Sequence, residues 1–106
     1  MPDPSLTRPV VIITGGQGEL ARVLREEFEA AGASVHAPGR AELDVRSADS
    51  VADFFARLDR IDLLVNNAGI TRDEWFLRLD EKSWDDVIET NLKGAFRCSR
   101  APAKVM

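Results

Sequence analysis

Apolar residues fall into two kinds of pattern along the chain, short apolar-rich runs and repeats at helical spacing. The runs have the length expected of strands buried in a parallel sheet. They occupy residues 10–13, 33–37 and 61–65. The repeats place apolar side chains on one face of a helix. They occupy residues 19–31, 47–58 and 84–100. Strands that alternate with helices in this way predict an α/β fold.

A further extended segment, residues 43–45, makes the expected topology incomplete. Only about five residues, 38–42, separate it from the second run. A crossover between parallel strands needs about a dozen residues. The third strand is therefore very short, or only an extended segment, and the helix before it is shortened or missing. We expect a Rossmann-like, doubly wound parallel sheet of about four strands in the order 3-2-1-4.

Local signals set the expected ends of the elements. Gly32 follows the first helix where a left-handed residue ends many helices. Ser47 precedes the second helix as a plausible N-cap. Pro102 predicts a kink or an end of the last helix near Arg100. Apolar residues within 71–79 predict a short additional helix.

Composition and charge exclude several classes of function. The chain of 106 residues fits one domain, preceded by a flexible tail at residues 1–9, which carries three prolines. A net charge of −4 without a basic block argues against nucleic acid as a partner. Apolar runs of about four residues argue against a membrane partner. The single cysteine, Cys98, excludes an intrachain disulfide and favours a cytoplasmic location, and we expect no metal site.

Three glycines, Gly15, Gly16 and Gly18, lie between the first strand and the first helix. Such a turn presents unpaired backbone N–H groups and the positive end of a helix dipole, which favour a pyrophosphate. The alternative is a tight turn without a ligand.

Two charged residues sharpen this interpretation. Asp44 could accept a hydrogen bond from an adenine amino group, although an ordinary carboxylate at a helix N-terminus is the alternative. Arg40 follows the second strand, where a base favours a dinucleotide with a 2′-phosphate and an acid favours a free 2′-hydroxyl. The pattern therefore favours NADP(H) over NAD(H) as the cofactor.

Four ordered motifs carry a resemblance to a known family. They are TGGQGELA at 14–21, LDV at 43–45, NNAG at 66–69 and TNLKGAF at 90–96. In this order they resemble the short-chain dehydrogenase/reductase family, and NNAGITRD with WDDVIETNLKGAF resembles its 3-oxoacyl-(acyl-carrier-protein) reductases. The resemblance covers residues 9 to 101 and identifies residues 10–106 as the N-terminal, dinucleotide-binding half of such a domain.

The resemblance implies roles for individual residues. By this resemblance, the residues next to the pyrophosphate and ribose would be Gly15, Gln17, Gly18 and Leu20. Asp44 and Val45 would bracket the adenine. Asn67, Ala68 and Gly69 would border the ribose. Asn91 matches the active-site asparagine, whose main-chain carbonyl holds a water in a proton relay.

Departures from the family limit what the chain can do. Glu19 and Ala21 replace common glycines, a spacing similar to that of the longer sugar-nucleotide-modifying members. The sequence has no tyrosine, so it lacks the family's catalytic acid, and Lys82, Lys93 and Lys104 have no such partner. Three hypotheses remain. The chain is the cofactor-binding portion of a reductase of 3-oxoacyl thioesters or similar ketones; or a non-catalytic module that forms homo-oligomers through residues 84–100; or a fold whose turn Glu19 has disabled.

Overall fold

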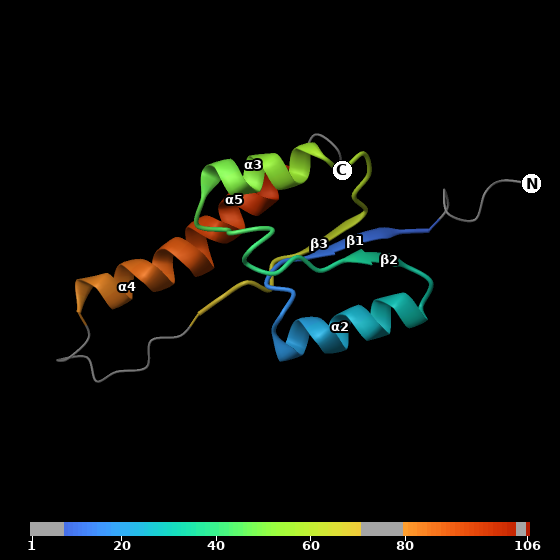
Figure 1. Cartoon of the computed structure of the whole chain (residues 1–106), viewed down its shortest axis with the longest axis horizontal. Helices are drawn as coiled ribbons and strands as arrows, with labels where there is room; N and C mark the ends of the chain where they lie inside the picture. Colours follow the sequence, from blue (N-terminus) through green and yellow to red (C-terminus); the bar gives the residue numbers. More distant parts are fainter. Residues whose placement is uncertain (1–7, 71–79, 104–105) are drawn as a thin grey trace, which may run out of the picture.

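The computed structural model describes residues 8–70, 80–103 and 106 as an α/β unit (Figure 1). Its elements follow in the order β1 (Val10–Ile13), α2 (Glu19–Ala30), β2 (Ser34–His36), α3 (Ala48–Ala56), β3 (Leu63–Val65), α4 (Glu81–Val87), the π-helical η2 (Ile88–Lys93) and α5 (Gly94–Arg100). The helix expected within 71–79, most of the tail and Lys104 lie outside the described residues.

The sheet is parallel and open, which confirms the predicted fold class. Its strands pair in the order β2-β1-β3, with Val11 opposite both Val35 and Leu63. The predicted strands one, two and four are therefore neighbours as expected. Residues 43–45 pair with none of them, because the chain turns back on itself: the N–H of Leu43 donates to the carbonyl of Gly39 at 3.0 Å. No third strand forms there in the described part of the chain, and the segment runs into a turn at Val45 and Arg46.

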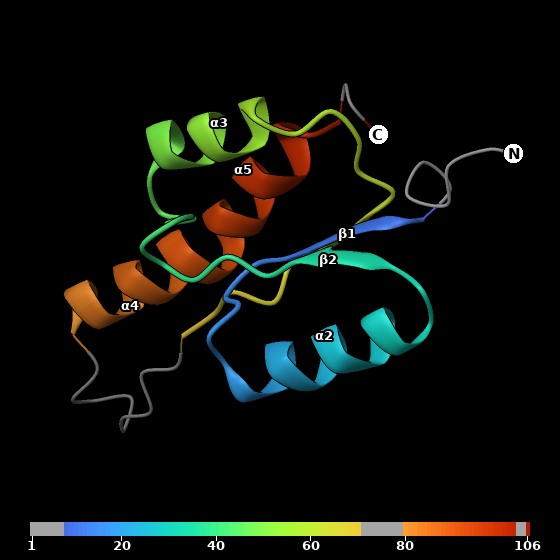
Figure 2. The same ribbon diagram turned by 45° about the vertical axis from the view of Figure 1, so that its right-hand side comes forward.

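Helices cover both faces of this sheet (Figure 2). Neighbouring residues of β1 point to opposite faces, as in any strand. Val11 and Ile13 pack against Ala21 of α2 on one face. Ile12 belongs to the larger core on the other face, which also includes Phe54 of α3. Alternation along one short strand thus joins two apolar layers into a single fold.

The predicted helix ends are confirmed where local chemistry sets them. Gly32 takes the left-handed conformation after α2, with φ +98°. Ser47 caps α3, since its hydroxyl accepts the N–H of Ser50 at 3.1 Å. Asp80 caps α4 in the same way, through the N–H of Ser83 at 2.7 Å. The last helix ends at Arg100, just before Pro102.

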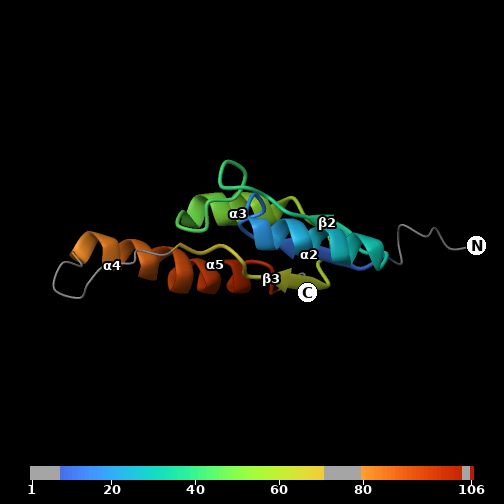
Figure 3. The same ribbon diagram turned by 90° about the horizontal axis from the view of Figure 1, so that it is seen from below.

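The predicted helix at 84–100 is a composite of α4, η2 and α5, and α4 lies beyond the end of the strands (Figure 3). Cys98 of α5 is 1% exposed and packs in the core. Burial raises the pKa of its thiol to about 11, so the thiol stays protonated at neutral pH. None of the helices in the described ranges is long and apolar enough to cross a membrane.

Candidate functional site

The turn after β1 depends on the absence of side chains. Gly15 has φ +66°, a conformation that residues with a Cβ rarely adopt. A Cβ on Gly16 would lie 1.9 Å from the carbonyl oxygen of Ala37, and the N–H of Gly16 donates to Pro38 at 2.8 Å. Gly18 faces open space apart from the Gly15 carbonyl. The turn is thereby pressed against the end of β2, with its Gly18 side open.

The first turn of α2 also remains open to an anion. Gly18 is its N-cap, and no side chain caps the helix there. Glu19 turns outward: its carboxylate lies 3.1 Å from the guanidinium of Arg22, and its side chain is 89% exposed. Leu20 is exposed, whereas the Gln17 side chain packs beside Gly39, at whose position a Cβ would lie 2.8 Å from it. Unpaired N–H groups at such a helix start suit a phosphate.

A buried threonine joins this turn to the end of β3. The hydroxyl of Thr14 accepts the N–H groups of Asn67 and Ala68, both at 3.0 Å. The side-chain amide of Asn67 donates in return to the carbonyls of Thr14, at 3.1 Å, and Gly15, at 3.3 Å. The two predicted motifs are therefore one hydrogen-bonded unit. Thr14 was not among the predicted site residues, although its position between a strand and glycines was a usable signal.

A pocket of about 170 Å³ opens beside this unit. Six predicted site residues line it: Gly15, Arg40, Asp44, Val45, Ala68 and Gly69. The sequence interpretation missed four more: Leu43, Arg46, Ile70 and Thr90. Pockets that enclose a drug-sized ligand measure roughly 300–1,000 Å³. This one is smaller, and it adjoins the open turn at Gly15.

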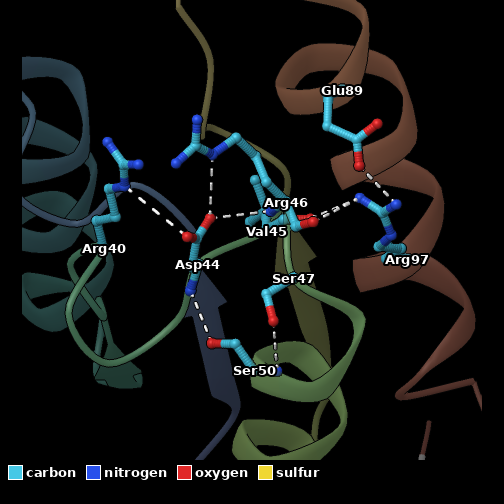
Figure 4. A network of polar contacts seen from close by, with 8 residues as sticks. All are labelled: Arg40, Asp44, Val45, Arg46, Ser47, Ser50, Glu89 and Arg97. Carbon is cyan, nitrogen blue, oxygen red and sulfur yellow. Dashed lines mark hydrogen bonds and ion pairs between the residues drawn. The ribbon is translucent and has the colours of Figure 1, made fainter. Parts of the chain in front are cut away.

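Two guanidinium groups flank the Asp44 carboxylate at this pocket (Figure 4). Its Oδ1 accepts the backbone N–H of Arg46 at 3.0 Å and the Nε of the same residue at 3.4 Å. Its Oδ2 lies 3.9 Å from the Nε of Arg40, a side chain that is mostly exposed. The Asp44 N–H donates to Ser50 at 2.9 Å. Oδ2 thus retains room for a further donor, while the arginines make the surroundings of the pocket positive.

The π-helical segment η2 forms the wall opposite. Asn91 does not line the pocket; its side chain pairs with the backbone of Ile70, accepting the N–H at 2.8 Å and donating to the carbonyl at 2.9 Å. Its neighbour Thr90 does line the pocket, and the buried Thr90 hydroxyl has no hydrogen-bond partner within the described part of the chain. π-Helical turns often occur at functional sites. Here the turn coincides with the predicted active-site asparagine.

The sequence profile of the short chain dehydrogenase family matches residues 11–106. Two similar curated proteins are 3-oxoacyl-(acyl-carrier-protein) reductases. That of Staphylococcus aureus is 41% identical over 84% of this chain and 37% of its own length, and that of Aquifex aeolicus is 44% identical over 81% and 36%. A crystal structure of a short-chain dehydrogenase from Streptomyces avermitilis superposes with TM-score 0.84 at 28% identity, covering 92% of this chain and 44% of its own. The chain thus spans just over a third of the length of these curated relatives.

Proposed function

The chain belongs to the short-chain dehydrogenase family, and from that premise we propose that it binds a nicotinamide dinucleotide at the carboxyl edge of its sheet. The observation that carries this proposal is the continuity between the open glycine turn and the pocket, which share Gly15. Ligands of open α/β sheets occupy this edge. The adenine would lie against Asp44 and Val45, and the pyrophosphate at Gly18 and the first turn of α2.

The remaining predicted residues complete this arrangement. The backbones of Gln17 and Leu20 would lie beside the pyrophosphate and ribose. Ala68 and Gly69 would border the ribose, while Asn67 holds them against the turn through its bonds to Thr14 and Gly15. We propose that these residues bind mainly through backbone groups.

We propose further that NADP(H) is preferred to NAD(H). Arg40 and Arg46 both line the pocket, so a 2′-phosphate at its edge, away from the Asp44 carboxylate, would have two guanidinium groups in the same site. Arginine is well suited to phosphate because its planar fork donates two parallel hydrogen bonds. The residues after β2, Ala37 and Pro38, supply no carboxylate for a free 2′-hydroxyl.

The reaction proposed for the whole protein is reduction of a 3-oxoacyl thioester, or a similar ketone, to the alcohol. The bound dinucleotide would supply the hydride. This chain would contribute the carbonyl of Asn91, which holds a water in a proton relay, and the bonds of Asn91 to Ile70 would keep that part of η2 in place. The catalytic acid is not a tyrosine of these residues, because the sequence contains none.

A second candidate function rests on the α4–α5 surface. Trp84 of α4, Leu92 of η2 and Phe96 of α5 are large, apolar and exposed. Surfaces of this kind often mark contacts between protein chains. A non-catalytic, dinucleotide-binding module that forms homo-oligomers through residues 84–100 would use both features. We place either form in the cytoplasm, because the buried, unpaired Cys98 suits a reducing compartment.

Calorimetric titration with NADPH and NADH tests the proposed cofactor. We expect micromolar affinity for NADPH and weaker affinity for NADH. Arg40→Ala should reduce that preference by roughly three- to tenfold, since Arg40 is mostly exposed and water screens its charge. Arg25→Ala is the matched control, because Arg25 lies on α2 and pairs with Glu29 at 2.6 Å. Absence of binding would contradict the proposed cofactor. Turnover of an acetoacetyl thioester by the purified chain would contradict the statement that this chain lacks the catalytic acid.

A further inference from the structure

The loop at 40–46 forms one side of the pocket, and Arg97 of α5 is hydrogen-bonded to it. Nη1 of Arg97 donates to the carbonyl of Val45 at 3.3 Å and to that of Arg46 at 3.2 Å. Its Nη2 lies 2.6 Å from Oε1 of Glu89, a residue of the π-helical segment η2 (Figure 4). The Arg97 side chain is only 22% exposed. A partly buried guanidinium with three acceptors is held in one orientation.

Close packing brings the helix within reach of this loop. A Cβ on Gly94 would lie 2.7 Å from Cγ2 of Val45 and 3.4 Å from the Val45 carbonyl oxygen. Gly94 is the first residue of α5, and Arg97 follows it by about one turn. The absence of a side chain at Gly94 therefore lets the helix lie directly on Val45 and places Arg97 over the next carbonyls.

The loop needs such support because no strand holds it. Residues 43–45 make no ladder with the sheet. Two other bonds to this loop are local: the N–H of Leu43 donates to Gly39, and that of Asp44 donates to Ser50. The carbonyls of Val45 and Arg46 accept from Arg97. Arg97 thus replaces the ladder bonds that the shortened crossover has lost.

One peptide unit connects Arg97 to the Asp44 carboxylate. The Val45 carbonyl and the Arg46 N–H belong to the same planar peptide, and in a trans peptide they point in opposite directions. The carbonyl accepts from Arg97, and the N–H donates to Oδ1 of Asp44 at 3.0 Å. When Arg97 binds the Val45 carbonyl, it also fixes the direction of the Arg46 N–H, which holds the Asp44 carboxylate.

We propose that Arg97, held by Glu89, is a positioning residue that sets Asp44 and Val45 in the orientation in which they recognise the adenine ring. This inference rests on the proposed dinucleotide site. Arg97 does not line the pocket; it acts through the peptide between Val45 and Arg46. The pKa of the Glu89 carboxyl is lower than usual, and its hydrogen bond with Arg97 is the largest cause.

The test compares NADPH with reduced nicotinamide hypoxanthine dinucleotide phosphate, in which an oxygen replaces the adenine amino group. If Asp44 accepts a hydrogen bond from that amino group, the wild-type chain should bind NADPH about tenfold more tightly than the hypoxanthine form. Arg97→Met should weaken NADPH binding about tenfold and bring the ratio of the two affinities close to one. Arg97→Lys, which keeps a donor for the carbonyls, should retain part of the ratio.

Two further variants separate positioning from general loss of structure. Arg100→Met is the matched control, because Arg100 lies on the same helix over the Phe96 ring, 5.1 Å from its centre, and should leave the ratio unchanged. Glu89→Gln keeps an acceptor for Arg97 but removes the charge, and should lower the ratio by about twofold. This variant decides the matter if Arg97→Met does not fold.

The outcomes distinguish this inference from the function on which it rests. A wild-type chain that binds neither dinucleotide overturns the proposed function, and this inference with it. A wild-type chain that binds both forms equally overturns only the inference, because Asp44 then does not recognise the amino group. The inference also fails if the folded Arg97→Met variant, or Glu89→Gln in its place, keeps the wild-type ratio.

Discussion

The glycine turn at 14–20 and the loop at 40–46 lie at two ends of one candidate site, yet they are held in different ways. The turn is fixed by backbone geometry and by one hydroxyl, that of Thr14. The loop is fixed by side chains from other elements, including Arg97, which is 52 positions away from Val45. The backbone-defined end has no space for a side chain at Gly15 or Gly16, whereas the side-chain-defined end depends on distant residues. A single substitution should therefore affect the two ends differently.

The largest effect is expected at the turn. In Gly16→Ala the new Cβ would meet the backbone of Ala37 at 1.9 Å, which only a backbone shift can relieve, so the free energy of unfolding should fall by roughly 3 kcal/mol or more. Gly18→Ala is the matched control. Gly18 has φ −78°, and a Cβ there meets only the Gly15 carbonyl, at 3.5 Å, so stability should change by less than about 0.5 kcal/mol. Urea denaturation measures both.

Binding should show an effect of Gly18→Ala that stability does not. A methyl group at Gly18 would project where the pyrophosphate is proposed to lie, so Gly18→Ala should weaken NADPH binding while remaining folded. Equal unfolding midpoints for the two variants would show that the turn is not pressed against β2 as described. Unchanged affinity in Gly18→Ala would move the pyrophosphate away from this turn.

The next largest effect concerns the join between the turn and the end of β3. Thr14→Val removes the oxygen that accepts the N–H groups of Asn67 and Ala68 and leaves both without that acceptor. Thr14 is buried, so the expected loss is about 1–3 kcal/mol of unfolding free energy. Thr14→Ser keeps the oxygen and should retain most of that stability. If valine and serine were equivalent in chemical denaturation, the methyl group rather than the hydroxyl would hold these strands together.

The same contrast explains how much could be predicted from sequence. The helix after the glycines and the helix capped by Ser47 were predicted because each carries its own signals, Gly32 and the serine hydroxyl. The pairing of the strands followed from fold class. The glycine turn and the NNAG segment lie together as expected, because both follow strands that are neighbours in the sheet.

What sequence could not supply depends on geometry that arises only on folding. The π-helical segment at 88–93 interrupts a helix predicted as regular, and helical periodicity carries no signal for it. This segment presents Thr90 to the pocket. Nothing in the sequence distinguishes Arg97 from the other charged residues, because its role depends on how α5 packs on the loop. The expected third strand is absent because local turn bonds at Gly39 took its place.

The smallest effect is expected at Glu19, the residue that first suggested a disabled turn. Its carboxylate is paired with Arg22, whose guanidinium also contacts Glu26 at 3.1 Å. Exposed pairs at this spacing contribute about 0.2–0.5 kcal/mol. Glu19→Gln should therefore change stability by less than about 0.5 kcal/mol and NADPH affinity by less than about twofold, as measured by denaturation and calorimetry. Glu26→Gln, one turn beyond Arg22 on the same face, is the control for loss of a charge next to Arg22. A gain of tenfold or more in affinity for Glu19→Gln alone would mean that this carboxylate faces the pyrophosphate when the ligand is bound, and that the open turn is not the state that binds.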